Sequence, residues 1–143
     1  MSDACGQSRT AAFRWPMRVY YEDTDAGGVV YYANYLKYLE RARTEWLRAA
    51  GYEQTKIAAE RGFLFVVRAV SIDYRAPARL DDQLDVTARI ERVGRASVDF
   101  AQSVECDAAE LCRARVSVAC LDAETFRPRV LPADLKGVFA GEH

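Results

Sequence analysis

The sequence predicts an α+β fold in which an antiparallel β-sheet is wrapped around one long central α-helix. In residues 33–50, larger or apolar side chains recur at spacings of three and four, as in an amphipathic helix. Several other stretches alternate between apolar and polar side chains, as in strands with one covered face. A sheet with a single apolar face needs a cover, and this chain has one long helix to provide it.

The length and charge of the chain limit its organisation and its partners. At 143 residues the chain fits one domain, which we expect to span residues 13–143. Residues 1–12 are small and polar and predict a disordered N-terminal arm. The formal net charge of -1 argues against partners such as nucleic acid or an anionic membrane surface.

The cysteine and histidine content argues against metal and redox chemistry. Cys5, Cys106, Cys112 and Cys120 lack the paired spacing of a zinc site, and the single histidine, His143, is the last residue. A histidine-based catalytic triad is therefore close to excluded, and we expect no metal or other cofactor. No apolar run approaches the roughly 18 residues of a membrane span, and the N-terminus lacks a signal peptide's apolar segment. These absences predict a reduced, cytoplasmic protein.

The first strand is predicted to begin at Phe13. Its apolar face is expected to hold Phe13, Trp15, Met17, Val19 and Tyr21, with mostly polar residues between them. Pro16 cannot donate a backbone hydrogen bond, so it confines the early part of this strand to a sheet edge or a bulge.

The long helix is predicted to follow the glycine pair Gly27 and Gly28. Its larger or apolar residues are Tyr35, Tyr38, Leu39, Ala42, Trp46 and Ala49. Gly51 is placed to end the helix, because glycine readily adopts the left-handed conformation common at that position. A shorter helix is predicted next, ending at Gly62.

The alternating stretches after Gly62 predict the remaining strands. Their apolar sets are Leu64, Val66, Val70, Ile72 and Tyr74; Leu84, Val86, Ala88 and Ile90; Val98, Phe100, Val104 and Cys106; and Cys112, Ala114, Val116, Val118 and Cys120. Arg68 shares the parity of Val66 and Val70, which predicts that it lies on the apolar face. There it needs a partner, either a carboxylate of the protein or a phosphate or carbonyl of a ligand.

The stretch "EDTDAGGVVYYANY" at residues 22–35 contains the candidate chemistry. An aspartate such as Asp25, just before a helix, commonly caps that helix or stabilises a turn. However, Gly27 and Gly28 let the backbone pass close to another group, and the helix start presents unpaired N–H groups and the positive end of its dipole. A carboxylate beside backbone donors is the arrangement that ester or thioester hydrolysis requires.

The stretches "FRWPMRVYYEDTDAGGVVYYANYLKYLERARTEWLR" and "FVVRAVSIDYRAPARLDDQL" resemble the acyl-CoA thioesterases of the hotdog superfamily. The similarity runs from Phe13 to about Leu131. It is greatest to the group associated with the Tol-Pal envelope system, which is related to 4-hydroxybenzoyl-CoA thioesterase.

The resemblance implies a hotdog fold and specific roles for residues of the loop. Asp25 would be the catalytic carboxylate, acting as general base or nucleophile, and the Tyr32 backbone N–H would bind the thioester carbonyl oxygen. Gly27, Gly28 and Val29 would line the path of the substrate. The resemblance also implies that active sites form between paired subunits of a homodimer or homotetramer.

Several other residues have weaker claims to a role. The Tol-Pal-associated group usually has histidine where this chain has Tyr32, which leaves the acyl group open. Arg95 and Ser97, in a turn, are candidates for contact with the pantetheine or nucleotide. Glu40 lies on the central helix, from which some hotdog thioesterases supply a catalytic glutamate, but an ion pair with Lys37 or Arg43 is favoured. We interpret Asp23 as structural, at the end of the first strand.

We therefore expect an acyl-CoA thioesterase that releases a free acid and CoA. The alternative is a hotdog scaffold that binds acyl carrier protein or lipid-synthesis enzymes and has little turnover. A dehydratase of the same fold is disfavoured, because it would need a histidine inside the chain.

Overall fold

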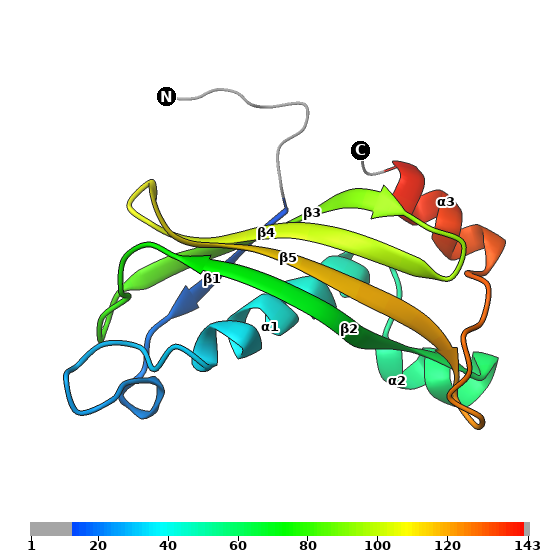
Figure 1. Ribbon diagram of the computed structural model, residues 1–143, viewed down its shortest axis with the longest axis horizontal. Coiled ribbons are helices and arrows are strands. Elements are labelled where there is room, and N and C mark those ends of the chain that lie inside the picture. Colours follow the sequence, from blue (N-terminus) through cyan, green and yellow to red (C-terminus); the bar gives the residue numbers. More distant parts are fainter. Residues whose placement is uncertain (1–12, 142–143) are drawn as a thin grey trace.

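Residues 13–141 are described in the computed structural model, and they form a five-stranded sheet that lies over helix α1 (Figure 1). The strands are β1 (Phe13–Arg18), β2 (Phe63–Tyr74), β3 (Gln83–Val93), β4 (Ser97–Cys106) and β5 (Ala109–Asp122). The helices are α1 (Asn34–Ala49), α2 (Gln54–Lys56) and α3 (Ala133–Gly141), with a 3₁₀ turn η2 (Tyr21–Asp23) and a π-helical turn η3 (Ile57–Arg61). The predicted α+β fold with a central helix is confirmed. The predicted arm, residues 1–12, lies outside the described residues.

All the strand pairs of the sheet are antiparallel, in the order β1-β3-β4-β5-β2. Strand β1 is at one edge, as Pro16 predicted, and pairs with β3 from Phe13↔Ala88 to Arg18↔Gln83. Strand β2 is at the other edge and pairs with β5. The helices between β1 and β2 carry the chain across to the far edge, so each edge strand has one hydrogen-bonded neighbour.

The core lies between α1 and the inner face of the sheet, the face that α1 covers. The inner-face residues predicted for β3, β4 and β5 are buried, apart from a half-buried Cys106. Helix α1 buries Tyr35, Tyr38, Leu39, Ala42 and Trp46, as predicted. Two expectations for this region were wrong: Ala49 is exposed at the end of α1, and Tyr21 is 82% exposed because β1 ends at Arg18 and η2 follows.

Helix α3 was not predicted, and it completes the core at one end of the sheet (Figure 1). Leu135 and Phe139 of α3 are fully buried, and the Phe139 ring stacks on that of Trp46 with 5.4 Å between centroids. The sheet is therefore covered by α1 over most of its length and by α3 beyond the end of α1.

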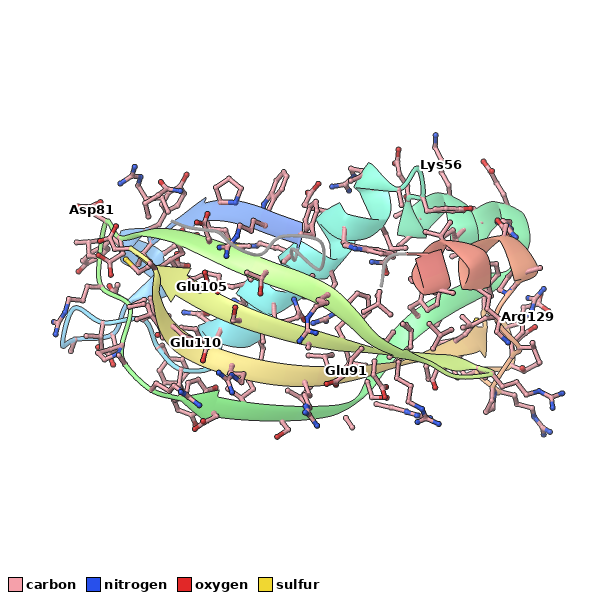
Figure 2. The ribbon with its side chains drawn as sticks, turned by 90° about the horizontal axis from the view of Figure 1, so that it is seen from above. Lys56, Asp81, Glu91, Glu105, Glu110 and Arg129 are labelled. Atoms are coloured by element: carbon pink, nitrogen blue, oxygen red, sulfur yellow. The ribbon has the colours of Figure 1, made fainter. Side chains whose placement is uncertain are left out.

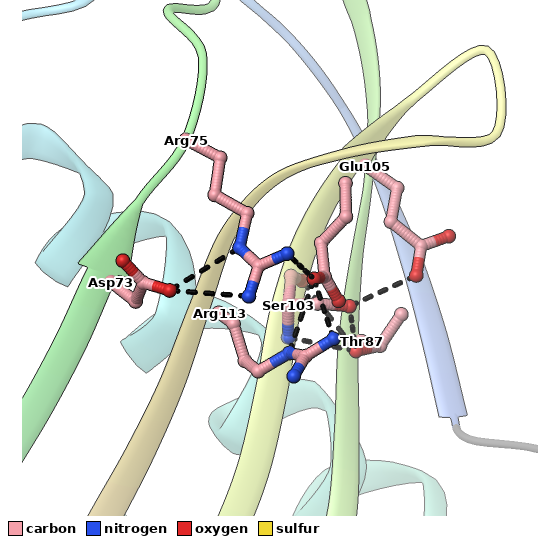
Figure 3. Close-up of polar contacts among 7 residues, drawn as sticks. Asp73, Arg75, Thr87, Ser103, Glu105 and Arg113 are labelled. Carbon is pink, nitrogen blue, oxygen red and sulfur yellow. Dashed lines mark hydrogen bonds and ion pairs between the residues drawn. The ribbon is translucent and has the colours of Figure 1, made fainter.

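The outer face of the sheet is polar, as predicted. Figure 2 looks onto this face, where Glu91, Glu105 and Glu110 project from the strands. The close-up in Figure 3 includes Thr87 and Ser103, whose hydroxyl oxygens are 2.8 Å apart on neighbouring strands. Exposed ion pairs such as Arg113 with Glu110, at 2.9 Å, each contribute only about 0.2–1 kcal/mol to stability. This face therefore needs no cover.

Strand β2 contains a bulge that overturns its predicted faces. Val67 pairs with Val118, but the next paired residue, Ala69, opposes Ser117, so Arg68 is an extra residue. The bulge reverses the alternation, so that Val66 and Val70 lie on opposite faces of the sheet. The prediction that Arg68 shares an apolar face with both valines was therefore wrong.

Candidate active site

The loop before α1 folds into a small hairpin with Asp25 at its tip. An isolated antiparallel bridge joins Thr24 to Val30, and the Gly28 N–H donates to the Asp25 carbonyl at 3.0 Å. Gly28 has a φ of 78°, a left-handed conformation that glycine adopts at little cost. A second bridge, between Val29 and Arg79, ties the hairpin to the segment that precedes β3.

The Asp25 carboxylate has one oxygen engaged and one free. Its Oδ1 accepts a hydrogen bond of 2.8 Å from the Gly27 N–H. Its Oδ2 has no hydrogen-bond partner among residues 13–141, and the side chain is exposed. Asp25 thus does stabilise a turn, and it also keeps an unengaged carboxylate oxygen available for chemistry.

The backbone N–H groups of Tyr32 and Ala33 are open. Within the described part of the chain, neither group donates a hydrogen bond, and the N-cap residue Ala33 supplies no side-chain cap. The neighbouring donors are all engaged: Val30 N–H with the Ala78 carbonyl, Tyr31 N–H with the Asp23 carbonyl, and Asn34 N–H with the Tyr31 carbonyl. Two free donors therefore stand at the positive end of the α1 dipole.

Asp23 holds this loop in place. Its Oδ2 accepts a 2.9 Å hydrogen bond from the Tyr20 N–H, and its carbonyl accepts from the Tyr31 N–H and from Asn34 Nδ2 at 3.1 and 2.8 Å. These contacts agree with a structural role. The expectation that Asp23 ends the first strand was wrong, because β1 ends at Arg18.

An aromatic cleft of about 280 Å³ lies beside the free donors, lined by Tyr32, Tyr35 and Tyr74 among others. The Tyr74 hydroxyl donates to the Tyr32 carbonyl at 3.2 Å. The Tyr35 hydroxyl accepts the Ala78 N–H at 2.9 Å, and burial raises the pKa of Tyr35. Sequence reasoning did not give Tyr35 and Tyr74 a role here, since only the fold brings β2 beside the start of α1.

The three remaining predicted contact residues lie away from Asp25 in the described chain. Arg68 projects from the bulge and donates to Ser117 Oγ at 2.9 Å and to Ser97 Oγ at 3.3 Å. Arg68 and Ser97 are thus brought together. The partners of Arg68 are two serine hydroxyls and not a carboxylate. Arg95 and Ser97 lie at the β3–β4 turn, near α3 and at the opposite end of the sheet from the loop before α1 (Figure 1).

Other features bear on the chemistry. Neither predicted ion pair of Glu40, with Lys37 or with Arg43, forms among residues 13–141, and Glu40 is exposed. That part of the chain also contains no group of three or more His, Cys, Asp or Glu side chains that could hold a metal ion. His143 lies outside the described residues. No described helix is both long and apolar enough to span a membrane.

Comparison with known proteins places the chain in a family. The sequence profile of the Thioesterase-like superfamily matches residues 19–139. The chain belongs to this superfamily. Acyl-CoA thioester hydrolase YbgC of Escherichia coli O6:H1 is 47% identical to it over 131 residues, which are 91% of this chain and 97% of that protein.

Solved structures of the superfamily have the same fold. A probable thioesterase from Bartonella henselae superposes with a TM-score of 0.82 at 38% identity, covering 85% of this chain and 100% of that one. Slr0204, a 1,4-dihydroxy-2-naphthoyl-CoA thioesterase from Synechocystis, gives a TM-score of 0.84 at 25% identity, with coverages of 91% and 96%. The predicted hotdog fold and membership of a thioesterase family are both confirmed.

Proposed function

We propose that this chain hydrolyses the thioester of an acyl-CoA to a free acid and CoA, with Asp25 and the Tyr32 backbone N–H as the catalytic groups. One observation carries the proposal: a carboxylate with a free oxygen and a helix start with free N–H groups belong to the same short loop, beside an aromatic cleft. The membership of the Thioesterase-like superfamily and the similarity to an acyl-CoA thioester hydrolase support it.

The reaction assigns a task to each group. The thioester carbonyl oxygen accepts the Tyr32 N–H, and the α1 dipole stabilises the negative charge that develops on that oxygen. Asp25 Oδ2 either takes a proton from a water that attacks the carbonyl carbon or attacks that carbon itself. In the first case the C–S bond breaks, the free acid is released, and the CoA sulfur takes the proton that Asp25 received from the water. In the second case CoA leaves as a thiolate, and a water molecule then hydrolyses the mixed anhydride between the acyl group and Asp25, which releases the acid and restores the carboxylate. Gly27, Gly28 and Val29 form the backbone past which the thioester enters.

The proposed site needs a second copy of the chain, and β2 is the surface that fits it. One edge of this strand has no partner among the described residues, although β2 spans 12 residues. Val67, Val70 and Tyr74 on this strand are 41%, 42% and 45% exposed. A long, apolar, unpaired edge strand is a template for pairing with another strand. We therefore infer a homodimer, alone or within a homotetramer, in which two β2 strands pair antiparallel about a two-fold axis.

This pairing would bring the remaining predicted residues to the site. If the whole strand pairs, Phe63 of one copy lies opposite Tyr74 of the other. Within one copy, Ser97 of β4 lies at the same end of the sheet as Phe63 of β2. Both pair with the same end of β5, because Phe63 opposes Asp122 and Ser97 opposes Ala119. The partner's Arg95 and Ser97 would then lie at the same end of the dimer as Asp25. Acyl carrier protein as a partner and a cytoplasmic location remain predictions.

Thiol release from a panel of acyl-CoAs, measured with wild type and Asp25→Asn, tests the catalytic assignment. The variant should lose about 10³-fold or more in turnover with an unchanged melting temperature, since it removes the carboxylate that we propose acts together with the free N–H groups of the same loop. Mass spectrometry excludes deamidation back to aspartate. Asp23→Asn is the matched control: it should lower stability and keep turnover within about tenfold, because Asp23 holds the loop. Equal turnover by wild type and Asp25→Asn would reject the assignment, and a wild type without turnover would favour the scaffold function.

Light scattering tests the shared site. Wild type should be a dimer or a dimer of dimers at micromolar concentration, and Val70→Lys should give monomers with at least about tenfold lower turnover, because a charge at the paired edge opposes pairing. Val130→Lys is the control, since Val130 is 50% exposed but lies outside β2. A fully active wild-type monomer would contradict the model.

A further inference from the structure

Arg43 is the charged residue of α1 that faces the core. It is only 9% exposed, and its Nη1 donates to Gln102 Oε1 at 2.9 Å. Gln102 Nε2 in turn donates to the carbonyls of Leu39 and Thr87, each at 3.1 Å. Because its NH₂ group is committed to these carbonyls, Gln102 is held with its oxygen toward Arg43.

The Arg43 guanidinium forms no ion pair with a carboxylate of residues 13–141. Its one hydrogen-bond partner among residues 13–141 is the neutral Gln102 amide, so its Nε and Nη2 groups remain available. Burial lowers the pKa of Arg43 to about 10, and the charge of Glu40, one turn earlier on α1, opposes this shift. Arg43 therefore stays protonated at neutral pH. A buried cation without a paired anion is unfavourable unless a ligand supplies one.

A pocket of about 380 Å³ opens onto Arg43 between α1 and β2. Its walls are mainly apolar and include Leu47, Phe65, Phe100 and Val118. Arg43 is its buried charged group, while Glu40 borders the pocket from an exposed position. The pocket thus combines room for a short apolar chain with one cation.

The pocket borders the same β2 edge that we assign to the second copy. In the two-fold arrangement described above, Phe65 of one copy lies opposite Ile72 of the other, near the cleft formed by Tyr32 and Tyr74. An acyl group attached to a thioester at Asp25 of one subunit would therefore point toward the Arg43 pocket of its partner.

We propose that this pocket receives an acyl group ending in a carboxylate, which Arg43 binds, so that the substrates include CoA thioesters of short dicarboxylic acids. This inference rests on the proposed thioester hydrolysis. The apolar walls hold the methylene chain, and the planar guanidinium matches a carboxylate with two parallel hydrogen bonds. Arg43 is then a specificity-determining residue, distinct from the groups that act on the thioester.

The test compares glutaryl-CoA with 5-methylhexanoyl-CoA, which has the same chain length and replaces the carboxylate by a branched group of similar shape. Wild type should favour glutaryl-CoA by roughly tenfold or more in kcat/KM. Arg43→Met should lose roughly 30-fold or more on glutaryl-CoA and stay within about threefold on 5-methylhexanoyl-CoA, because only the former has the charged group. Arg43→Lys, which keeps the charge, should restore part of the preference.

Glu40→Gln provides a control of opposite sign. It removes an acidic group at the mouth of the pocket and should raise kcat/KM for glutaryl-CoA about two- to fivefold, with little effect on 5-methylhexanoyl-CoA. A merely structural Arg43 would affect both substrates equally.

Two outcomes would overturn the inference alone: wild type that hydrolyses both thioesters without preferring glutaryl-CoA, and an Arg43→Met variant with an unchanged ratio. If Arg43→Met does not fold, the wild-type ratio decides. Wild type that hydrolyses no acyl-CoA at all would overturn the proposed function and this inference with it.

Discussion

Helix α1 and the loop before it, residues 24–33, are adjacent in the chain but differ in how the fold uses their groups. In α1, Tyr38, Leu39 and Ala42 are fully buried and pack against the sheet. In the loop, Asp25 Oδ2 and the N–H groups of Tyr32 and Ala33 have no partner among the described residues. The difference teaches that packing accounts for the buried apolar side chains of the helix, while the loop keeps exposed polar groups that folding does not use.

If this contrast is correct, substitutions of the buried apolar residues of α1 should change mainly stability, and substitutions that disturb Asp25 or the free N–H groups of the loop should change mainly turnover. Polar groups that are left without hydrogen-bond partners are expected at functional sites. The following changes test the contrast, beginning with the largest expected effect.

Leu39→Ala should reduce the free energy of unfolding by about 2–5 kcal/mol, because it leaves a cavity at a fully buried position. The folded fraction should keep a kcat within about threefold of wild type, since Leu39 lies inside α1 and outside the loop that holds both proposed catalytic groups. Denaturant unfolding and thiol-release assays measure the two quantities. Leu36→Ala, at a 44% exposed position of the same helix, should change stability by less than about 0.5 kcal/mol and serves as the control.

Gly28→Ala should cost about 1–2 kcal/mol of stability, because alanine is strained at a φ of 78°. Apart from the adjoining residues of the chain, no atom lies within 4 Å of the added methyl group, so the cost arises from backbone conformation and not from a clash. Thermal unfolding measures it. An unchanged melting temperature would show that the loop relaxes to another turn.

Gly27→Ala should affect turnover more than stability. A Cβ at this position would lie 3.3 Å from Asp25 Oδ1, so the carboxylate must shift by a few tenths of an ångström. We expect a kcat loss of about three- to tenfold, because small misplacements of a catalytic group are costly. Gly27→Ala should therefore change mainly turnover, while the neighbouring Gly28→Ala should change mainly stability. If the two variants had equal effects on turnover and on stability, this expected difference would be contradicted.

Periodicity within the chain was sufficient to predict α1, the strands and most of the core. It could not predict the bulge at Arg68, because an extra residue reverses the alternation and leaves no mark in the sequence "FVVRAV". Helix α3 had a signal in Leu135, Val138 and Phe139, which are spaced three and four apart, but the stretch is short. The burial of Arg43 could not be predicted, because a charged side chain is expected at the surface. It is explained by the hydrogen bond to Gln102 of β4, which only the fold brings beside Arg43.

The candidate site was also predictable only in part, because local sequence signals mark some of its groups and distant residues determine the others. The glycine pair and the aspartate are local signals, so Asp25 and the helix start could be singled out from the sequence. The Tyr32 N–H was named only through the family resemblance. Local signals could not show that it is free, because the N–H groups of Val30 and Tyr31 are engaged by the carbonyls of Ala78, distant in the chain, and of Asp23. Likewise, the cleft depends on Tyr74, which the sheet brings beside Tyr32.

Tyr32→Phe is the smallest expected effect and the sharpest test of which Tyr32 group acts. The side chain is 61% exposed, while the backbone carbonyl is held by the Tyr74 hydroxyl and the N–H is free. Removing the phenol oxygen leaves this N–H and the α1 dipole in place, so kcat should stay within roughly tenfold of wild type, less than the 10²- to 10³-fold loss typical of a deleted oxyanion donor. Any change should appear in KM or acyl preference, since the ring lines the cleft. A 10³-fold loss in kcat with intact binding would instead assign the donor role to the phenol, and the loop would then act through a side chain and not through its unengaged backbone.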